Sequence, residues 1–181
     1  MDSNDRVGRE QALRGAVLAG DEQIWRLWYE ETYTGLYAYV LWRCGGLRDR
    51  ADDVVQETWL TAVRQVRRFD PVQGSFAGWL RGIAANLLRN HFRHERCRRT
   101  EALNGHLSAP DTERQRREQG ERIAAALSRL PDHYEAVLRA KYVDELSVAE
   151  IAATSGDTPK AIESLLSRAR QLFRDTYEKD V

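Results

Sequence analysis

The feature that most constrains this chain's fold is the spacing of its apolar residues, which recur every three or four positions along most of its 181 residues. Such runs cover 24–41, 76–88 and 123–142, and another from Val55 to Val66 places Val63 with Trp59 and Ala62 on one face. This period is that of an α-helix with one buried face, and no segment shows the two-residue alternation of a strand. The sequence therefore predicts an all-α protein.

Two interruptions divide the pattern. In FDPVQGS, Pro71 and Gly74 end one helix and Ser75 is suited to cap the next. From residue 100 to residue 120 the periodicity disappears into a polar stretch with Pro110 and two glycines, typical of a flexible linker. All five tryptophans lie at or before residue 79, so the first half has its own aromatic core. We expect an N-terminal tail (1–19), two small helical domains (20–99 and 121–181) and a linker (100–120).

The most informative run is SVAEIAATSGDTPKAIESLLSRARQLFR, residues 147–174. Ser147 and Glu150 have capping-box spacing, and Gly156 suits a tight turn. Thr158 can cap a second helix that has Pro159 in its first turn. A short helix, a glycine turn and a longer amphipathic helix predict a helix-turn-helix, whose second helix enters a DNA major groove. The alternative is an ordinary αα-hairpin with a charged outer face.

Charge is balanced overall but not locally, since Lys+Arg and Asp+Glu both total 28. Residues 81–99 hold six arginines and one acid, a concentration that favours contact with phosphates. No apolar run approaches the roughly 18 residues that span a bilayer, and the polar N-terminus lacks a secretory signal. With only two distant cysteines, Cys44 and Cys97, the sequence favours a cytoplasmic protein with reduced thiols and no membrane insertion.

In order and separation, three stretches resemble bacterial RNA polymerase sigma factors of the extracytoplasmic-function (ECF) type, in the sigma-70 family. They are AGDEQIWRLWYEETYTGLYAYV, then ADDVVQETWLTAVRQVRRFD with GSFAGWLRGIAANLLRNHFR, and finally LSRLPDHYEAVLRAKYVDELSVAEIA followed by IESLLSRAR. The resemblance runs from about Gly20 to Arg174. It implies a region 2-like helical bundle and a region 4-like helix-turn-helix, and a protein that directs core RNA polymerase to promoters without being an enzyme or needing a cofactor.

The resemblance also implies three binding surfaces. Core RNA polymerase would bind the helix around DDVVQETWL, and the residue pattern itself places acids there opposite Val55 and Trp59, although a solvated face is the usual reading of such charges. The matching residues are Asp52, Asp53, Gln56 and Glu57. Melted minus-10 DNA would be held by the loop 69–75 and the following helix. The candidates are Phe69, Ser75, Asn86, Arg89, Asn90, Arg93 and Arg96.

The third implied surface is the helix-turn-helix, which would read the minus-35 element as duplex DNA. Its candidates are Thr158, Lys160, Glu163, Ser164, Ser167, Arg168 and Arg170. Glu163 and Leu165 depart from the basic residues common in relatives, and in the minus-10 helix Ala85 and Asn90 stand where relatives often carry arginine and aspartate. We therefore expect a promoter preference of its own. Besides core polymerase and promoter DNA, the resemblance implies an anti-sigma factor as a further partner.

Two other functions compete with this reading. A stand-alone helix-turn-helix regulator would bind duplex DNA without polymerase, but it leaves the acidic DDVVQET helix without a use. A metal site from His91, His94 and Cys97 is disfavoured, because residues at i, i+3 and i+6 diverge by about 120° around a helix. No glycine-rich phosphate loop or nucleophile motif points to an enzyme.

Overall fold

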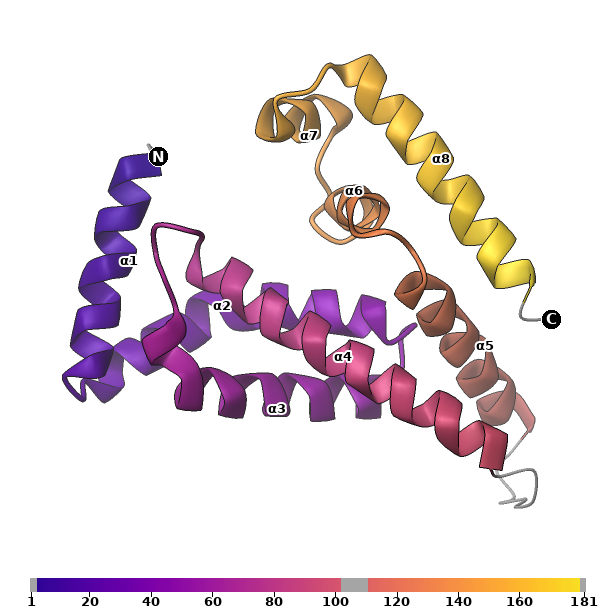
Figure 1. Cartoon of the computed structure of the whole chain (residues 1–181), viewed down its shortest axis with the longest axis horizontal. Coiled ribbons are helices and arrows are strands. Elements are labelled where there is room, and N and C mark those ends of the chain that lie inside the picture. The colour runs from indigo at the N-terminus through magenta and orange to yellow at the C-terminus, as the bar shows by residue number, and fades with distance from the viewer. Residues whose placement is uncertain (1–2, 102–110, 180–181) are drawn as a thin grey trace. The chain divides into compact units, whose positions relative to one another are not determined.

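The computed structural model describes the backbone of residues 3–101 and 111–179 and the side chains of residues 5–91 and 112–179. Within these ranges the secondary structure is helical, as predicted (Figure 1). The first half contains α1 (Ser3–Leu18), α2 (Glu22–Arg43), α3 (Arg48–Gln65), the 3-10 turn η1 (Val66–Arg68) and α4 (Phe76–Glu101). The second half contains α5 (Asp111–Ser128), α6 (Asp132–Tyr142), α7 (Val148–Ser155) and α8 (Pro159–Glu178).

Contacts divide the chain into two compact units, residues 1–40 with 49–91 and residues 41–48 with 92–181. Two helices lie where the sequence suggested a tail and a linker. Helix α1 fills most of 1–19, and α5 begins at Asp111 inside the polar stretch 100–120. This polar part of α5 is supported by ion pairs at i, i+4, with Arg114 Nε 2.9 Å from Glu118 and Arg117 Nε 3.4 Å from Glu121. Residues 102–110 lie outside the described chain.

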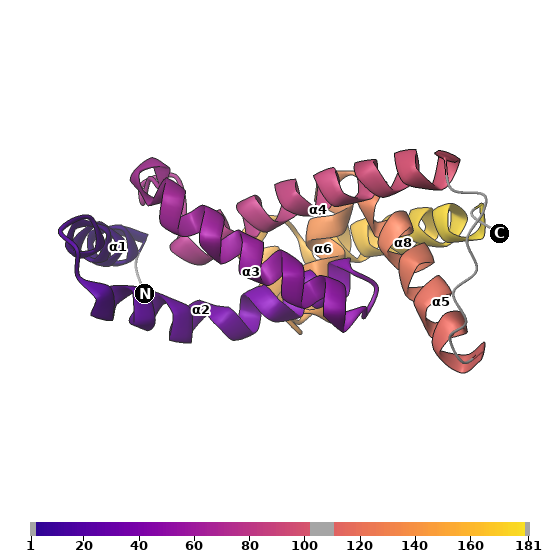
Figure 2. The same ribbon diagram turned by 90° about the horizontal axis from the view of Figure 1, so that it is seen from below.

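The first unit is a bundle in which α2, α3 and α4 lie side by side in both views (Figures 1 and 2). Its centre is aromatic, as predicted, with the rings of Trp28 and Phe76 stacked at a centroid distance of 3.9 Å. Trp25, Trp59 and Trp79 pack around Phe76 at 5.7–6.3 Å. Helix α1 lies at the end of the bundle from which the α3–α4 connection (residues 66–75) emerges.

The second unit packs α8 against α5, α6 and α7. Its core gathers apolar residues from all four helices and from the turn between α5 and α6, namely Leu127, Leu130, Val137, Leu138, Ile151, Ala152, Ile162, Leu166 and Ala169. The buried residues of α8 recur at spacings of three and four, so this helix has one apolar face and leaves the opposite face to solvent. Short α7 and long α8 are joined by a tight turn (Figure 1).

Candidate partner-binding and nucleic-acid-binding surfaces

The outer face of α3 carries the four polar residues expected to bind a partner. Its buried residues are Ala51, Val54, Val55, Thr58 and Ala62. Between them, Asp52, Asp53, Gln56 and Glu57 are all exposed. The structure therefore brings these four together as one surface, complementary in charge to a basic helix.

Two apolar residues, Leu60 and Val63, prolong this surface with exposed fractions of 51% and 53%. The expectation that Val63 faces inward is wrong, because Ala62 occupies the buried stripe and the next residue is rotated by about 100°. Apolar groups beside charges are typical of protein-binding surfaces. Spacing alone does not distinguish Val63 from the inward-facing residues, since the helix could be rotated slightly either way.

His91 joins α4 to the acidic face of α3, with its Nε2 3.2 Å from Oε2 of Glu57. The side chains of His94 and Cys97 lie outside the described residues. Among the side chains that are described, no group of three His, Cys, Asp or Glu residues is placed to hold a metal ion. The contact that the structure gives His91 is the one with Glu57, and it links α4 to α3.

Phe69, in the α3–α4 connection, requires a correction. Its side chain is 2% exposed and its ring lies 5.5 Å from those of Phe76 and Trp79 and 6.0 Å from that of Trp28. With its ring enclosed by the aromatic core, Phe69 has no face on which a DNA base could stack. The prediction that it contacts minus-10 DNA is wrong, and its role is to anchor the connection.

The tip of the connection, at Val72 and Gln73, is exposed. Asp70 orders this tip, since its Oδ1 accepts a hydrogen bond from the Val72 N–H at 3.1 Å and its Oδ2 accepts one from the Gln73 side chain at 3.2 Å. Pro71 is buried beside it, whereas Val72 is 65% exposed. An exposed valine on a fixed turn was not predicted, and it gives the connection an apolar contact surface.

Ser75 caps α4 as expected, because its hydroxyl oxygen accepts a hydrogen bond from the Gly78 N–H at 3.1 Å. Further along α4, Asn86, Arg89 and Asn90 are exposed on one face, and Arg89 donates a hydrogen bond to Asn86. Arg93 and Arg96 lie on the same helix, but their side chains fall outside the described residues. The described part of α4 thus presents amide and guanidinium groups suited to bases and phosphates.

The turn between α7 and α8 has the predicted local geometry. Ser147 and Glu150 form a complete capping box, and Gly156 is left-handed at φ 75°, where only glycine avoids strain. The Thr158 hydroxyl accepts a hydrogen bond from the Ala161 N–H at 3.2 Å, and Pro159 occupies the first turn of α8. These local interactions fix the direction in which α8 leaves α7.

The residues predicted for duplex recognition are all exposed, with Thr158 at the N-terminal cap of α8 and the others on its outer face: Lys160, Glu163, Ser164, Ser167, Arg168 and Arg170. Arg170 differs from the others in having an aromatic partner, since its Nε donates to the Tyr142 hydroxyl at 2.8 Å. Its guanidinium also lies 5.7 Å from the centre of the Tyr142 ring. Arg170 therefore lies at the α6 edge of the face.

Glu150 has a perturbed titration. Hydrogen bonds from the hydroxyl and the backbone N–H of Ser147 lower the pKa of this carboxyl. Both bonds favour the ionised form, so the capping box is strongest when Glu150 is charged.

Two family models match the chain: Sigma-70 region 2 over residues 28–98 and Sigma-70 region 4 over residues 120–173. Together they cover well over half of the chain. It belongs to the sigma-70 family. The region 2 match includes the acidic face of α3 and the exposed face of α4, and the region 4 match includes α7 and most of α8. Helix α1 precedes both matches.

Relatives of this sigma-70 family chain are ECF sigma factors. It is 29% identical over 157 residues to BldN of Streptomyces coelicolor, with 83% of this chain and 59% of that protein covered. It is 30% identical over 177 residues to SigC of Mycobacterium tuberculosis, with 96% and 87% covered. The chain thus spans less than two thirds of the length of BldN but most of the length of SigC, and it is of the ECF type.

Among solved structures, CnrH in complex with the cytosolic domain of CnrY has a similar fold, with a TM-score of 0.52 and 22% identity. The match covers 95% of this chain and 99% of that one. In the parts of the sigma-70 family chain that the structure describes, no helix combines the length and the apolar character needed to span a membrane.

Proposed function

We propose that this chain is a promoter-specificity subunit of RNA polymerase that acts in the cytoplasm and has no catalytic chemistry of its own. The observation that carries the proposal is the presence of regions 2 and 4 in one chain, each with its polar face exposed. The minus-10 domain would comprise residues 20–99 and the minus-35 domain residues 121–181. Promoter selection then arises from two DNA contacts that one subunit carries.

Core RNA polymerase would bind the acidic face of α3. The proposal is supported by the exposure of Asp52, Asp53 and Gln56 and by the apolar extension at Leu60 and Val63. Glu57 lies at the α4 edge of this face, beside His91. Charges of one sign around an apolar patch favour fast association and correct orientation of a basic helix.

The two DNA contacts would differ in kind. Single-stranded minus-10 DNA would contact Ser75, Asn86, Arg89 and Asn90, with Arg93 and Arg96 further along α4, because amides and arginines serve unpaired bases and backbone. Duplex minus-35 DNA would contact the outer face of α8. There Thr158, Lys160, Ser164, Ser167, Arg168 and Arg170 are suited to phosphates and base edges, and Glu163 to a cytosine amino group.

An inhibitory protein is a further proposed partner. CnrH was solved in complex with the cytosolic domain of CnrY, and this chain shares its fold. An anti-sigma factor that covers the faces of α3, α4 or α8 would block polymerase or DNA.

A gel-shift experiment separates this function from that of a stand-alone regulator. Promoter DNA selected from a random library is mixed with the chain, with core polymerase, or with both. We expect a specific complex only with both. A specific complex at nanomolar concentrations of the chain alone would favour the stand-alone regulator instead.

A further inference from the structure

Helix α1 precedes the two family matches, yet its polar side chains reach the α3–α4 connection, 53 and 65 residues away in sequence. The Arg6 guanidinium donates to the Pro71 carbonyl oxygen at 3.3 Å, and that of Arg14 donates to the Arg67 carbonyl oxygen at 2.9 Å. Both bonds end on backbone atoms, so they hold the path of the connection whatever side chains it carries. They bracket the anchor residue Phe69.

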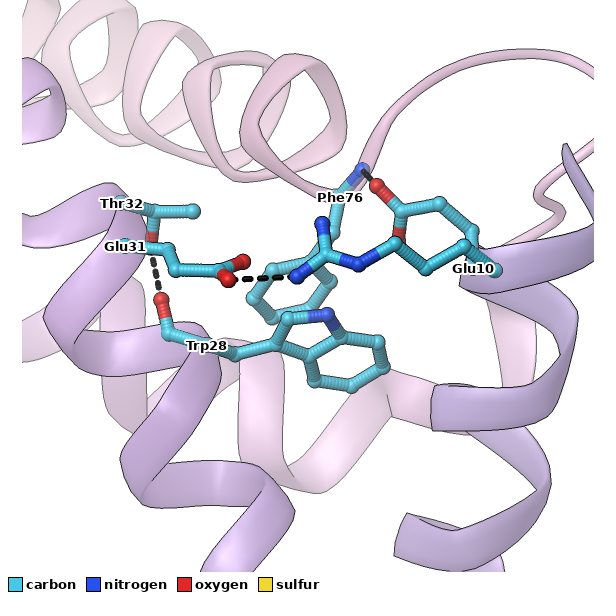
Figure 3. Close-up of polar contacts among 6 residues, drawn as sticks. Glu10, Trp28, Glu31, Thr32 and Phe76 are labelled. Atoms are coloured by element: carbon cyan, nitrogen blue, oxygen red, sulfur yellow. Dashed lines mark hydrogen bonds and ion pairs between the residues drawn. The ribbon is translucent and has the colours of Figure 1, made fainter. Parts of the chain in front are cut away.

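The third contact comes from Glu10, which lies between Arg6 and Arg14 on α1. Its Oε1 accepts a hydrogen bond at 3.1 Å from the N–H of Phe76, which is the first residue of α4 (Figure 3). The side chain is buried, at 8% exposure, and Oε2 has no hydrogen-bond donor among the described residues. A buried carboxylate needs compensation, and the positive end of α4 supplies it.

Helix α1 is itself fixed to the bundle by an apolar contact, since Val17 is buried at 7% exposure. Glu10 binds the backbone N–H of Phe76, and the ring of the same residue is stacked on Trp28 of α2 (Figure 3). The start of α4 is thereby held from two sides, by the aromatic core and by Glu10.

We propose that Arg6, Glu10 and Arg14 are positioning residues that hold the α3–α4 connection in the shape needed to capture unpaired minus-10 DNA. The inference rests on the proposed function, because it assigns α1 a part in promoter opening. A tip that carries exposed Val72 and Gln73 binds an unstacked base best when it is already ordered, since no ordering entropy is then lost on binding.

The test compares holoenzymes that contain wild type, Glu10→Ala, Glu10→Gln and Arg9→Ala. Glutamine keeps an oxygen that can accept from the Phe76 N–H, whereas alanine does not. Arg9 is the matched control on the same helix, because its ion-pair partner is Glu31 on α2 and both groups are exposed. Open complexes are measured by permanganate reactivity of unpaired thymines on DNA selected by the wild-type holoenzyme, and core affinity is measured by competition.

Losing a helix cap typically costs about 1 kcal/mol, which corresponds to about a fivefold change in an equilibrium. We therefore expect Glu10→Ala to lower the yield of open complexes about fivefold, with unchanged core affinity. Glu10→Gln should recover most of the loss, and Arg9→Ala should match wild type. Hydrogen exchange at the Phe76 amide should be faster in Glu10→Ala alone. Unchanged open complexes in Glu10→Ala, or a parallel loss of core affinity, would overturn the inference.

If Glu10→Ala does not fold, Arg14→Ala gives the same test at the other end of the connection. We expect faster amide exchange in residues 67–73 and fewer open complexes, and no change in either would overturn the inference. A wild-type holoenzyme that initiates at no promoter would contradict the proposed function. Amide exchange in the free chain would still report separately whether α1 holds the connection.

Discussion

Phe69 and Val72 lie three residues apart and play opposite parts. Phe69 fills the aromatic core at 2% exposure, whereas Val72 is 65% exposed at the tip of the connection. Replacing Phe69 by alanine leaves a cavity beside Trp28 and Phe76, so we expect Phe69→Ala to lower the free energy of unfolding by about 3–5 kcal/mol. Thermal or denaturant unfolding measures the loss.

Val72→Ala is the matched control, since it removes an exposed apolar side chain from the same connection. Its free energy of unfolding should stay within about 0.5 kcal/mol of wild type. Equal stability of Phe69→Ala and Val72→Ala would show that Phe69 is not a core residue.

Glu150 makes stability depend on pH. Hydrogen bonds from Ser147 lower its pKa below the ordinary 4.5, so the folded chain takes up this proton less readily than the unfolded chain. The stabilisation is complete above the ordinary pKa and is lost as pH falls through the lowered value. Wild type has this stabilisation at neutral pH and the Glu150→Gln variant lacks it. As the pH is lowered from neutral to strong acid, the difference between their unfolding midpoints should therefore shrink.

The exposed control for this titration is Glu163→Gln on α8. It removes one negative charge without touching the capping box. The same pH-dependent difference in both variants would assign the effect to net charge and not to the Ser147–Glu150 pair.

At the scale of elements, α8 is predicted to carry the duplex contact. Arg168 lies on its outer face, so Arg168→Ala should weaken binding of the holoenzyme to duplex minus-35 DNA. If Arg168 contacts a phosphate, the negative slope of log affinity against log salt should become less steep by about 1. If Arg168 contacts a base, sequence specificity at one position of the minus-35 element should relax. Arg116→Ala, exposed on α5, is the control, and an equal effect there would contradict the assignment.

Helix α3 is predicted to carry the polymerase contact. Asp53→Lys places a positive charge on the face proposed to bind a basic helix, where it would repel that helix. We therefore expect affinity for core polymerase to fall at least about tenfold at low salt. Glu113→Lys reverses an exposed charge on α5 and should leave core affinity unchanged. A competition assay against a labelled sigma factor measures both, and equal affinities for the two variants would remove α3 from the interface.

The sequence predicted elements well where the determining interactions are local. The capping box of Ser147 and Glu150, the left-handed Gly156 and the Thr158 cap all depend on residues within four positions of one another. Burial of Phe69 and the reach of Glu10 to Phe76 depend on contacts between distant segments, and no short motif encodes them. The polar start of α5 resembled a linker because its stabilising ion pairs use the same residue types as a solvated coil.

At the scale of the whole molecule, the surfaces proposed to bind DNA belong to the two regions that the family models match, and the face proposed to bind polymerase lies in the first compact unit. If the proposed function holds, one subunit contacts a promoter at two elements while attached to polymerase. Two contacts on one chain gain affinity from effective concentration, so neither needs to be tight by itself.

Run-off transcription with purified core polymerase tests the central claim most directly. The template is promoter DNA selected from a random library by the chain together with core enzyme. We predict a transcript of a single start site with chain and core together, and none with either alone. Specific initiation by core without the chain, or its absence with both present across the selected library, would contradict the assignment of this protein as a sigma factor.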